Sequence, residues 1–417
     1  MNGDRDNRLA VGTVVEADGR TLIVAELDAE AVLNLLAQEG RGTVLAIDAS
    51  GADADGVTGR LNGEIVKQME IKDAVLVIQT ESVSYTLPAA CLDIDEISSR
   101  FEHVSSLADI NISIEVASAT PGQISLLQEA AERESFVPVM MPVNFTVRAE
   151  FAGRTIEVRE FNAYVEREMT LPEGTDPAKV TSGVIVHEDG TVTHVPTFIE
   201  IRGNRYVVKL NSLTNSAYAV IYNPRTFADA EGHWAERLIN EMASRKVVEG
   251  KTGQRFLPND PVTRAEFAAM LVRGLGLSDK AVSGAAELYA DVRSADWHFG
   301  AVMKASEYGL VKGYDDGTFR PDERITREQA MTVIHRAMAV AGVDAKGEHA
   351  EDSLAKHPYG SMVSDWAKSA AAAVTETGIF HGSPEGLKPQ AAMTRAEAAV
   401  VLHRLLTAAQ LINPLQS

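Results

Sequence analysis

The sequence predicts an α+β first half that is rich in β-strands, and an all-α second half built from three helical repeats. Short alternating apolar runs dominate before residue 223, whereas helical periodicity interrupted by glycine- and proline-bearing loops dominates after residue 226. The tryptophans, Trp234, Trp297 and Trp366, recur at separations of 63 and 69 residues, which indicates an internal repeat. We divide the chain into an α+β module (1–135), a β-rich module (136–222) and repeats at 226–280, 286–345 and 352–413.

Regular elements of the first half follow from its apolar periodicity. We expect strands at 21–25, 43–47, 74–80 and 110–116, with helices at 28–38, 62–70, 92–101 and 123–132. From residue 137 the pattern is nearly all strand, at 144–151, 155–160, 184–187, 191–195, 198–201 and 206–210. The turn pairs Asp189-Gly190 and Gly203-Asn204 predict two hairpins.

The first half carries no motif that identifies a reaction, a cofactor or a metal. Asp53 and Asp55 lie in a loop that faintly resembles a calcium loop, but Gly51 and Asn62 occupy the positions of its first and twelfth ligands. We therefore interpret this loop as a polar connection. The acidic residues between positions 157 and 168 fit solvated strand faces, although a catalytic carboxylate pair in residues 1–222 stays open as an alternative.

Composition limits the partners of the chain. With 39 Lys and Arg against 59 Asp and Glu, the net charge is −20, which argues against nucleic acid and anionic lipid as partners. An anionic partner would have to be bound by a few placed cations. Apolar stretches are too short to span a membrane, and Met1–Leu9 shows no hydrophobic signal region. Cys91, the single cysteine, excludes an intramolecular disulfide and is interpreted as a small buried side chain.

Each repeat of the second half has the same expected plan. An aromatic residue opens it (Phe227, Tyr289 or Tyr359), and a tryptophan, a first helix, a glycine loop and a second helix follow. Two such helices cannot bury their apolar faces alone, so the three repeats should pack into one body. We expect first helices at 235–245, 299–308 and 367–377, loop glycines at Gly250, Gly313 and Gly382, and second helices at 263–275, 326–340 and 394–408.

The second helix begins with the same four-residue box in every repeat. Its threonine and its glutamate or glutamine predict a capping box, from the pairs Thr263 and Glu266, Thr326 and Gln329, and Thr394 and Glu397. Between them stands an arginine, Arg264, Arg327 or Arg395. A cation at this position opposes the helix dipole, so we interpret it as part of an anion site formed with the helix amides, suited to a carboxylate. In the alternative, each arginine pairs with an acid of a neighbouring repeat, such as Asp229, Asp291 or Asp316.

The repeated tryptophans and glycines each have an ordinary interpretation. A tryptophan at helical spacing usually belongs to the core, although an indole at the edge of a groove could also face a sugar ring. A repeated glycine usually marks a turn with positive φ, although it also lets a ligand approach backbone N–H groups.

These residues together resemble a known family. Phe227-Ala-Asp229, Trp234-Ala235, Gly313-Tyr-Asp-Asp-Gly-Thr-Phe-Arg-Pro321 and the three Thr-Arg boxes are similar to S-layer homology domains. The resemblance implies a pseudo-threefold helical assembly whose grooves bind secondary cell wall polysaccharide, notably pyruvylated N-acetylmannosamine, on Gram-positive-type bacteria. The implied ligand groups are Arg264, Arg327, Arg395, Asp229, Asp291, Trp234, Trp297, Trp366 and backbone near Gly250, Gly313 and Gly382.

The resemblance implies a secreted, non-catalytic anchor at the bacterial surface, without a nucleic-acid or membrane partner. The third repeat departs from the pattern, because Ser361 stands where the opening aspartate is expected. The first repeat also lacks the tyrosine-bearing loop, with Gly250-Lys-Thr-Gly-Gln-Arg-Phe256 in its place. Residues 1–222 more faintly resemble the β-rich spacers that precede such repeats. Two alternatives stay open, a fragment of a cell-surface carbohydrate-active enzyme and a self-associating S-layer lattice protein.

Overall fold

The computed structural model describes residues 9–17, 19–252, 254–280, 287–344, 350–382 and 385–415. Most of the predicted polar N-terminal stretch, and the loop positions Gly253, Ser383 and Pro384, lie outside the described residues. The chain forms two compact units, the first comprising residues 1–192 and 199–221 and the second residues 193–198 and 222–417. Within the described ranges, no helix is long and apolar enough to cross a membrane.

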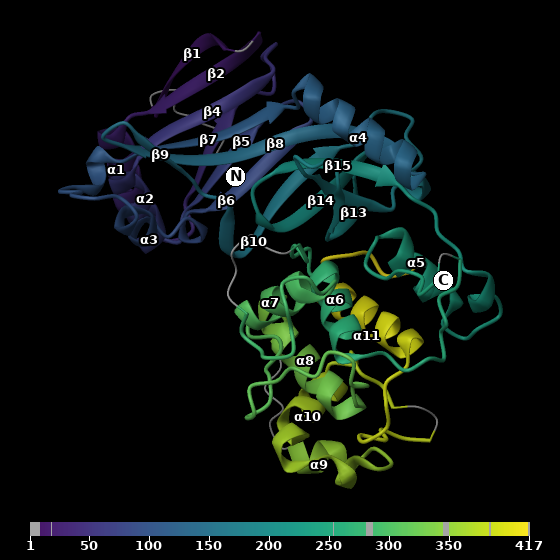
Figure 1. Ribbon diagram of the computed structural model, residues 1–417. Coiled ribbons are helices and arrows are strands. Elements are labelled where there is room, and N and C mark those ends of the chain that lie inside the picture. Colours follow the sequence, from purple (N-terminus) through teal and green to yellow (C-terminus); the bar gives the residue numbers. More distant parts are fainter. Residues whose placement is uncertain are drawn as a thin grey trace. The chain divides into compact units, whose positions relative to one another are not determined.

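Two mixed sheets organise the strands of the first half (Figure 1). Strands from both predicted modules share each sheet, since β7 (Asn111–Ser118) pairs with β8 (Val137–Phe151) and β6 (Val83–Pro88) with β10 (Glu160–Thr170). Parallel pairing joins β2 (Arg20–Leu27) to β4 (Gly56–Asn62) and β3 (Val44–Asp48) to β5 (Val75–Gln79). One sheet has the order β1 (Ala10–Ala17), β2 (Arg20–Leu27), β4 (Gly56–Asn62), β7 (Asn111–Ser118), β8 (Val137–Phe151), β15 (Ala217–Tyr222), β11 (Ser182–Val186), β12 (Val192–Val195), with β9 (Arg154–Glu157) on β8. The other has the order β13 (Thr197–Arg202), β14 (Arg205–Thr214), β10 (Glu160–Thr170), β6 (Val83–Pro88), β5 (Val75–Gln79), β3 (Val44–Asp48).

Four helices accompany these sheets in the described part of the first half: α1 (Ala29–Gln38), α2 (Gly63–Ile71), α3 (Ile94–Ser99) and α4 (Pro121–Glu134). The amphipathic helix α4 packs its buried face, Leu127 and Ala130, against apolar residues of β11 and β15. Figure 1 shows it lying along β8 and β15. Helices α1 and α2 pack against each other at the other end of the strands.

A fully buried arginine lies in the core of the first unit. The Arg167 guanidinium on β10 lies over the rings of Tyr85, Phe145 and Tyr218, with centroids at 5.0, 5.3 and 4.7 Å. It donates to the carbonyl oxygens of Val165 and Thr214 and to the side-chain oxygen of Asn215. Cation–π contacts and hydrogen bonds therefore take the place of a carboxylate partner, and they connect strands of both sheets.

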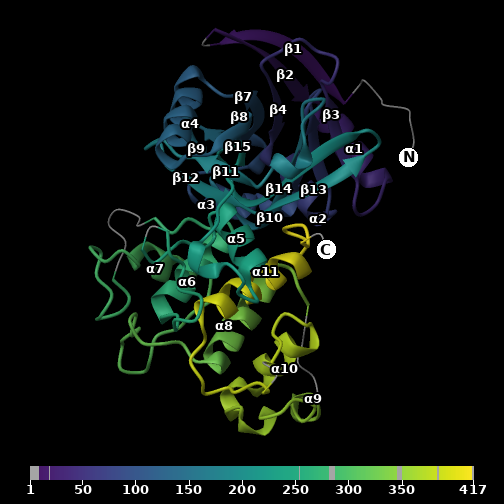
Figure 2. The same ribbon diagram turned by 90° about the vertical axis from the view of Figure 1, so that its right-hand side faces the viewer.

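The helices of the second unit pack in a closed cycle. The second helix of each repeat lies against the first helix of the next: α6 (Arg264–Gly274) against α7 (Phe299–Glu307), α8 (Arg327–Val340) against α10 (Lys368–Glu376), and α11 (Arg395–Ala408) against α5 (Glu236–Ser244). Figure 2 shows α11, near the end of the chain, beside α5, where the repeats begin. The helices are α5 (Glu236–Ser244), α6 (Arg264–Gly274), α7 (Phe299–Glu307), α8 (Arg327–Val340), α9 (Ala350–Leu354), α10 (Lys368–Glu376) and α11 (Arg395–Ala408).

The prediction of an all-α second half is wrong, because β-bridges join the three repeats and long loops separate the helices. The extended residues before the second helices form a ring of backbone hydrogen bonds, in which Val262 donates to Met393, Met393 to Ile325, and Ile325 to Val262 at 2.9, 3.0 and 3.1 Å. Antiparallel bridges flank this ring. The three side chains are buried, so their backbone groups must bond to one another. Helical periodicity cannot reveal such a pairing, because each repeat contributes only a short extended segment to it.

Candidate functional site

The start of each second helix is fully bonded within the protein. All three capping boxes are present, with the threonine hydroxyl accepting the N–H of the third helical residue and that residue's side chain accepting the threonine N–H. The next two amides donate to the following repeat, as in Arg264 N–H to Glu323 O and Ala265 N–H to Pro321 O at 2.9 and 3.0 Å. In the second repeat, the N–H groups of residues 327 and 328 donate to the carbonyl oxygens of residues 391 and 389. In the third repeat, those of residues 395 and 396 donate to the carbonyl oxygens of residues 260 and 258. The expectation that these helix amides receive an external anion is therefore wrong.

The arginine of each box reaches into the next repeat. Its Nε–H and one Nη2–H donate to two carbonyl oxygens at the ends of the glycine loop, and the guanidinium lies over an aromatic ring. These charged donors explain why an arginine stands at a helix start that its charge opposes, since each such bond contributes about 1.5–3 kcal/mol. The acceptors are Phe319 and Lys312 for Arg264, Leu387 and His381 for Arg327, and Phe256 and Glu249 for Arg395, at distances from 2.7 to 3.4 Å.

Carboxylates distinguish the three arginines. Arg327 forms an ion pair with Glu397, and Arg395 lies 3.6 Å from Glu266. Both arginines are buried, at 4% and 5% exposure. Arg264 is only partly buried and makes no ion pair with any residue that the structure describes. Arg327 and Arg395 therefore pair with an acid of a neighbouring repeat, as the alternative expected, but the partners are glutamates of the capping boxes and not Asp229, Asp291 or Asp316.

Asp229 and Asp291 hold the glycine loops of their own repeats. Asp229 accepts the N–H groups of Phe256 and Leu257 at 2.9 and 2.8 Å, and Asp291 makes the equivalent pair of bonds in the second repeat. These amide bonds, with Arg255 nearby, outweigh the desolvation that would raise the pKa of Asp229, so its pKa lies below the usual range. In the third repeat, the carbonyl of Pro358 accepts the N–H of Leu387 at 2.9 Å. A backbone oxygen therefore supplies one of the two loop contacts that the aspartate makes in the other repeats.

The loop glycines are required by close packing. A Cβ added at Gly313 would lie 2.4 Å from the Tyr289 ring and 2.8 Å from the Thr318 oxygen. A Cβ at Gly382 would lie 3.0 Å from the carbonyl carbon of Gly386. Neither Gly313 nor Gly382 has a positive φ, so the interpretation as a left-handed turn is wrong for both. Gly250 lines a separate cavity of about 320 Å³ with Phe227 and Lys246.

The three tryptophans are exposed, and the interpretation that they belong to the core is wrong. Trp234, Trp297 and Trp366 expose 66%, 65% and 59% of their surface. Each lies two positions before the first residue of its first helix, outside the apolar face that the helix buries. An indole that stays exposed in every repeat offers an apolar face suited to a sugar ring.

A groove of about 380 Å³ brings Trp366 close to the arginine of the first repeat. We call it the Arg264 groove. All three repeats contribute to it, through the start of α6, the glycine loop of the second repeat, one face of α8, and Trp366. Its charged lining consists of three cations and no carboxylate. Its polar and aromatic lining includes Arg264, Lys312, Tyr314, Phe319, Gln329, Arg336 and Trp366.

Arg336 is a residue of this groove that the sequence analysis missed. It donates to the Leu310 carbonyl at 3.3 Å, and burial lowers the pKa of its guanidinium. The available signal was periodic, because an arginine follows each capping threonine by ten residues, at Arg273, Arg336 and Arg404. An arginine that recurs at a fixed place in every repeat is as strong a signal as the arginine of the capping box.

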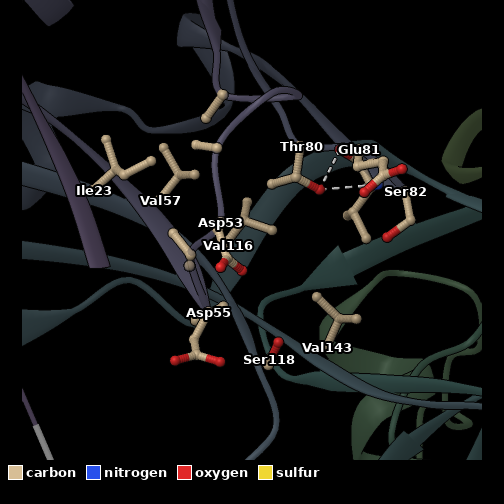
Figure 3. Close-up of a pocket in the computed structure, with 16 residues that line it drawn as sticks. Ile23, Asp53, Asp55, Val57, Thr80, Glu81, Ser82, Val116, Ser118 and Val143 are labelled. Atoms are coloured by element: carbon tan, nitrogen blue, oxygen red, sulfur yellow. Dashed lines mark hydrogen bonds between the residues drawn. The ribbon is translucent and has the colours of Figure 1, made fainter. Parts of the chain in front are cut away.

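The first unit has a separate hollow of about 250 Å³, lined by Asp53, Asp55 and Glu81 (Figure 3). In Figure 3 the two aspartates lie on one side of this hollow and Glu81 lies on the other. Asp55 accepts the backbone N–H of Thr21 at 2.9 Å. Among the residues that the structure describes, no group of three or more His, Cys, Asp or Glu side chains could hold a metal ion.

Comparison with known families identifies the repeats. Residues 226–268, 288–331 and 360–399 match the family model described as S-layer homology domain. The three matches fall on the three repeats, and each ends within the second helix.

Relatives with quite different names share similarity with this chain. An amylopullulanase of Thermoanaerobacterium thermosulfurigenes is 32% identical over 247 residues, covering 58% of this chain and 13% of the relative. The surface layer protein of Brevibacillus choshinensis is 33% identical over 159 residues, covering 35% of this chain and 14% of the relative. The cellulosome-anchoring protein of Acetivibrio thermocellus is 29% identical over 161 residues, covering 38% and 35%. This chain thus spans a minor part of the length of each.

Proposed function

Because the second half of this chain contains three S-layer homology domains, we propose that it anchors a secreted bacterial surface protein non-covalently to the cell wall. The ligand in this proposal is a secondary cell wall polysaccharide that carries an acidic substituent. Relatives named as an amylopullulanase, a surface layer protein and a cellulosome-anchoring protein share the similarity. A segment common to proteins with such different names fits an anchoring module better than a catalytic one.

The lining of the Arg264 groove is the observation that carries the proposal. Three cations line a groove without a carboxylate in a chain of net charge −20. A neutral sugar would not need this local excess of positive charge, whereas the carboxylate of a pyruvate ketal would be attracted by it. The exposed face of Trp366 then supports the sugar ring itself. Pyruvylated N-acetylmannosamine combines these two features and is the ligand that we propose.

The remaining predicted residues fit this proposal in supporting positions. Asp229 and Asp291 position the loop carbonyls that accept the arginines, and Gly313 and Gly382 allow the loops to pack closely. Residues 1–222 serve as a spacer or assembly module, and lateral self-association of that module is part of the proposal.

Binding to isolated cell walls tests this function. The full chain should sediment with walls that carry pyruvylated polysaccharide and stay in solution when the pyruvate has been removed. Retention should fall as salt rises from about 0.05 to 0.5 M, because screening weakens contacts between partly exposed charges. The Trp366→Ala variant should bind less while unfolding at the same temperature, since its side chain is largely exposed. Equal retention on both kinds of wall would rule out recognition of an acidic substituent.

A further inference from the structure

The third residue of each second helix differs in charge among the repeats. It is Glu266 in α6, Gln329 in α8 and Glu397 in α11. In two repeats this glutamate lies beside the Nη1 atom of the arginine from the repeat before it in the ring. Glu397 pairs with Arg327, and Glu266 lies near Arg395 of the last repeat. Gln329 occupies the equivalent place beside Arg264, and it donates to the hydroxyl of Tyr314 at 3.3 Å.

In the described part of the chain, Arg264 therefore lacks a carboxylate beside the atom that, in its two counterparts, lies close to a glutamate. Its Nε and Nη2 are bonded to loop carbonyls, as in the other repeats, but its Nη1 makes no hydrogen bond or ion pair to any residue in the described ranges. The side chain is also less buried than Arg327 and Arg395. An N–H of a charged guanidinium that faces a groove is available to a ligand carboxylate.

A second position distinguishes the first repeat from the second. This position directly precedes the loop glycine, and its carbonyl accepts the Nη2–H of an arginine from the preceding repeat. The residue there is Glu249, Lys312 or His381. Glu249 lies 3.1 Å from Arg273, which also bonds to Asp279. Arg273, the equivalent of Arg336 in the first repeat, is therefore paired with two carboxylates. Lys312 and Arg336, at the same places in the second repeat, make no ion pair with any described residue.

We infer that the Arg264 groove is the single strong site for an acidic sugar in this chain, and that glutamine at position 329 keeps it open. The inference rests on the proposed function and names which of three equivalent surfaces performs it. In the other two repeats, a glutamate of the protein already holds the position that the ligand carboxylate would take. Charge at one helical position thus selects the competent repeat.

Exchange of glutamine and glutamate tests the inference without disturbing the fold. Gln329→Glu introduces the residue that two capping boxes of this chain already contain, and Glu397→Gln makes the reverse change at the equivalent position. Calorimetric titration of the full chain with a pyruvylated N-acetylmannosamine glycoside would report affinity and stoichiometry. The same glycoside without pyruvate serves as the ligand control, and thermal unfolding confirms that each variant is folded.

The wild-type chain should bind one equivalent of the pyruvylated probe. Gln329→Glu should weaken this binding by about tenfold or more, because the new carboxylate competes for Arg264. Glu397→Gln should keep the first site and add a second, since it frees Arg327. Three equal sites in the wild type, or unchanged affinity in Gln329→Glu, would overturn the inference while leaving the proposed function intact. Absence of any binding by the folded wild-type chain would overturn both.

Discussion

Arg395 donates its Nε–H to the carbonyl oxygen of Phe256, which lies 2.9 Å away and 139 residues earlier in the chain. Arg264 and Arg327 make the same bond to the repeats that follow them. The bond of Arg395 therefore closes a ring, in which the last repeat holds the first. Linear repeat proteins contact only their sequence neighbours, whereas every repeat of this ring contacts both others.

Loss of the ring-closing arginine should destabilise the second unit. Arg395→Ala removes two bonds to carbonyls and leaves Glu266 beside an empty site, so we expect the free energy of unfolding to fall by about 3 kcal/mol or more. Urea denaturation of the full chain, followed by circular dichroism, would measure the loss. Arg293→Ala is a matched control, because Arg293 is exposed. An unchanged midpoint for Arg395→Ala would show that the ring does not stabilise the unit.

The tryptophans should matter for binding and little for stability. Replacing Trp234, Trp297 and Trp366 by alanine should change the free energy of unfolding by only about 0.5 kcal/mol each, because all three are largely exposed. Retention on pyruvylated walls should drop sharply in the same triple variant. A large fall in the unfolding temperature would contradict the placement of these side chains outside the core.

Close packing at Gly313 predicts a sensitive position. Gly313→Ala would force its Cβ against the Tyr289 ring and the Thr318 backbone, so the free energy of unfolding should fall by about 1–3 kcal/mol. Gly122→Ala, where an added Cβ meets nothing closer than 3.9 Å, should be neutral or slightly stabilising. Thermal unfolding of the two variants side by side measures the difference. Equal behaviour would refute the packing argument.

His403 makes the stability of the second unit depend on pH. Burial lowers the pKa of its imidazole to about 4, with Glu241 raising it and Arg245 and Arg404 lowering it further. Because the unfolded imidazole binds a proton at about pH 6.5, stability is fully present above that pH. It should fall by at most about 3 kcal/mol as the pH drops from 6.5 to 4.

The His403→Leu variant should flatten this pH dependence. Some slope should persist, because burial also holds the pKa of His194 well below its usual range. Chemical denaturation of both proteins at several pH values between 4 and 7 would show the effect. Parallel curves for wild type and variant would exclude His403 as a cause.

The helices of the repeats could be predicted to within one or two residues because their boundary signals are local. Threonine, arginine and glutamate or glutamine lie within four positions, and the predicted 263–275 and 394–408 match α6 and α11 closely. In the first half, β1, β4, β6 and β10 are not among the predicted strands. β4, β6 and β10 each lie between two other strands. The pairing that places them there joins segments far apart in sequence, such as β6 with β10, and no local pattern reveals it.

The partners of the arginines could not be predicted, because the ring closes between residues far apart in sequence. Nothing local to Arg395 indicates the carbonyl of Phe256, and the helix dipole suggested a ligand where a neighbouring repeat supplies oxygens. The size of a tryptophan favours burial on average, so composition alone could not decide between a place in the core and a place at the edge of a groove. Their position before the helix, and not their hydrophobicity, decides their exposure.

A crystal structure of the full chain with a pyruvylated N-acetylmannosamine glycoside would test the central claim most directly. We expect the pyruvate carboxylate to lie in the Arg264 groove, within about 4 Å of a nitrogen of Arg264, Lys312 or Arg336, with the sugar ring against Trp366. A sugar bound outside this groove, or one whose carboxylate points to solvent, would contradict the account.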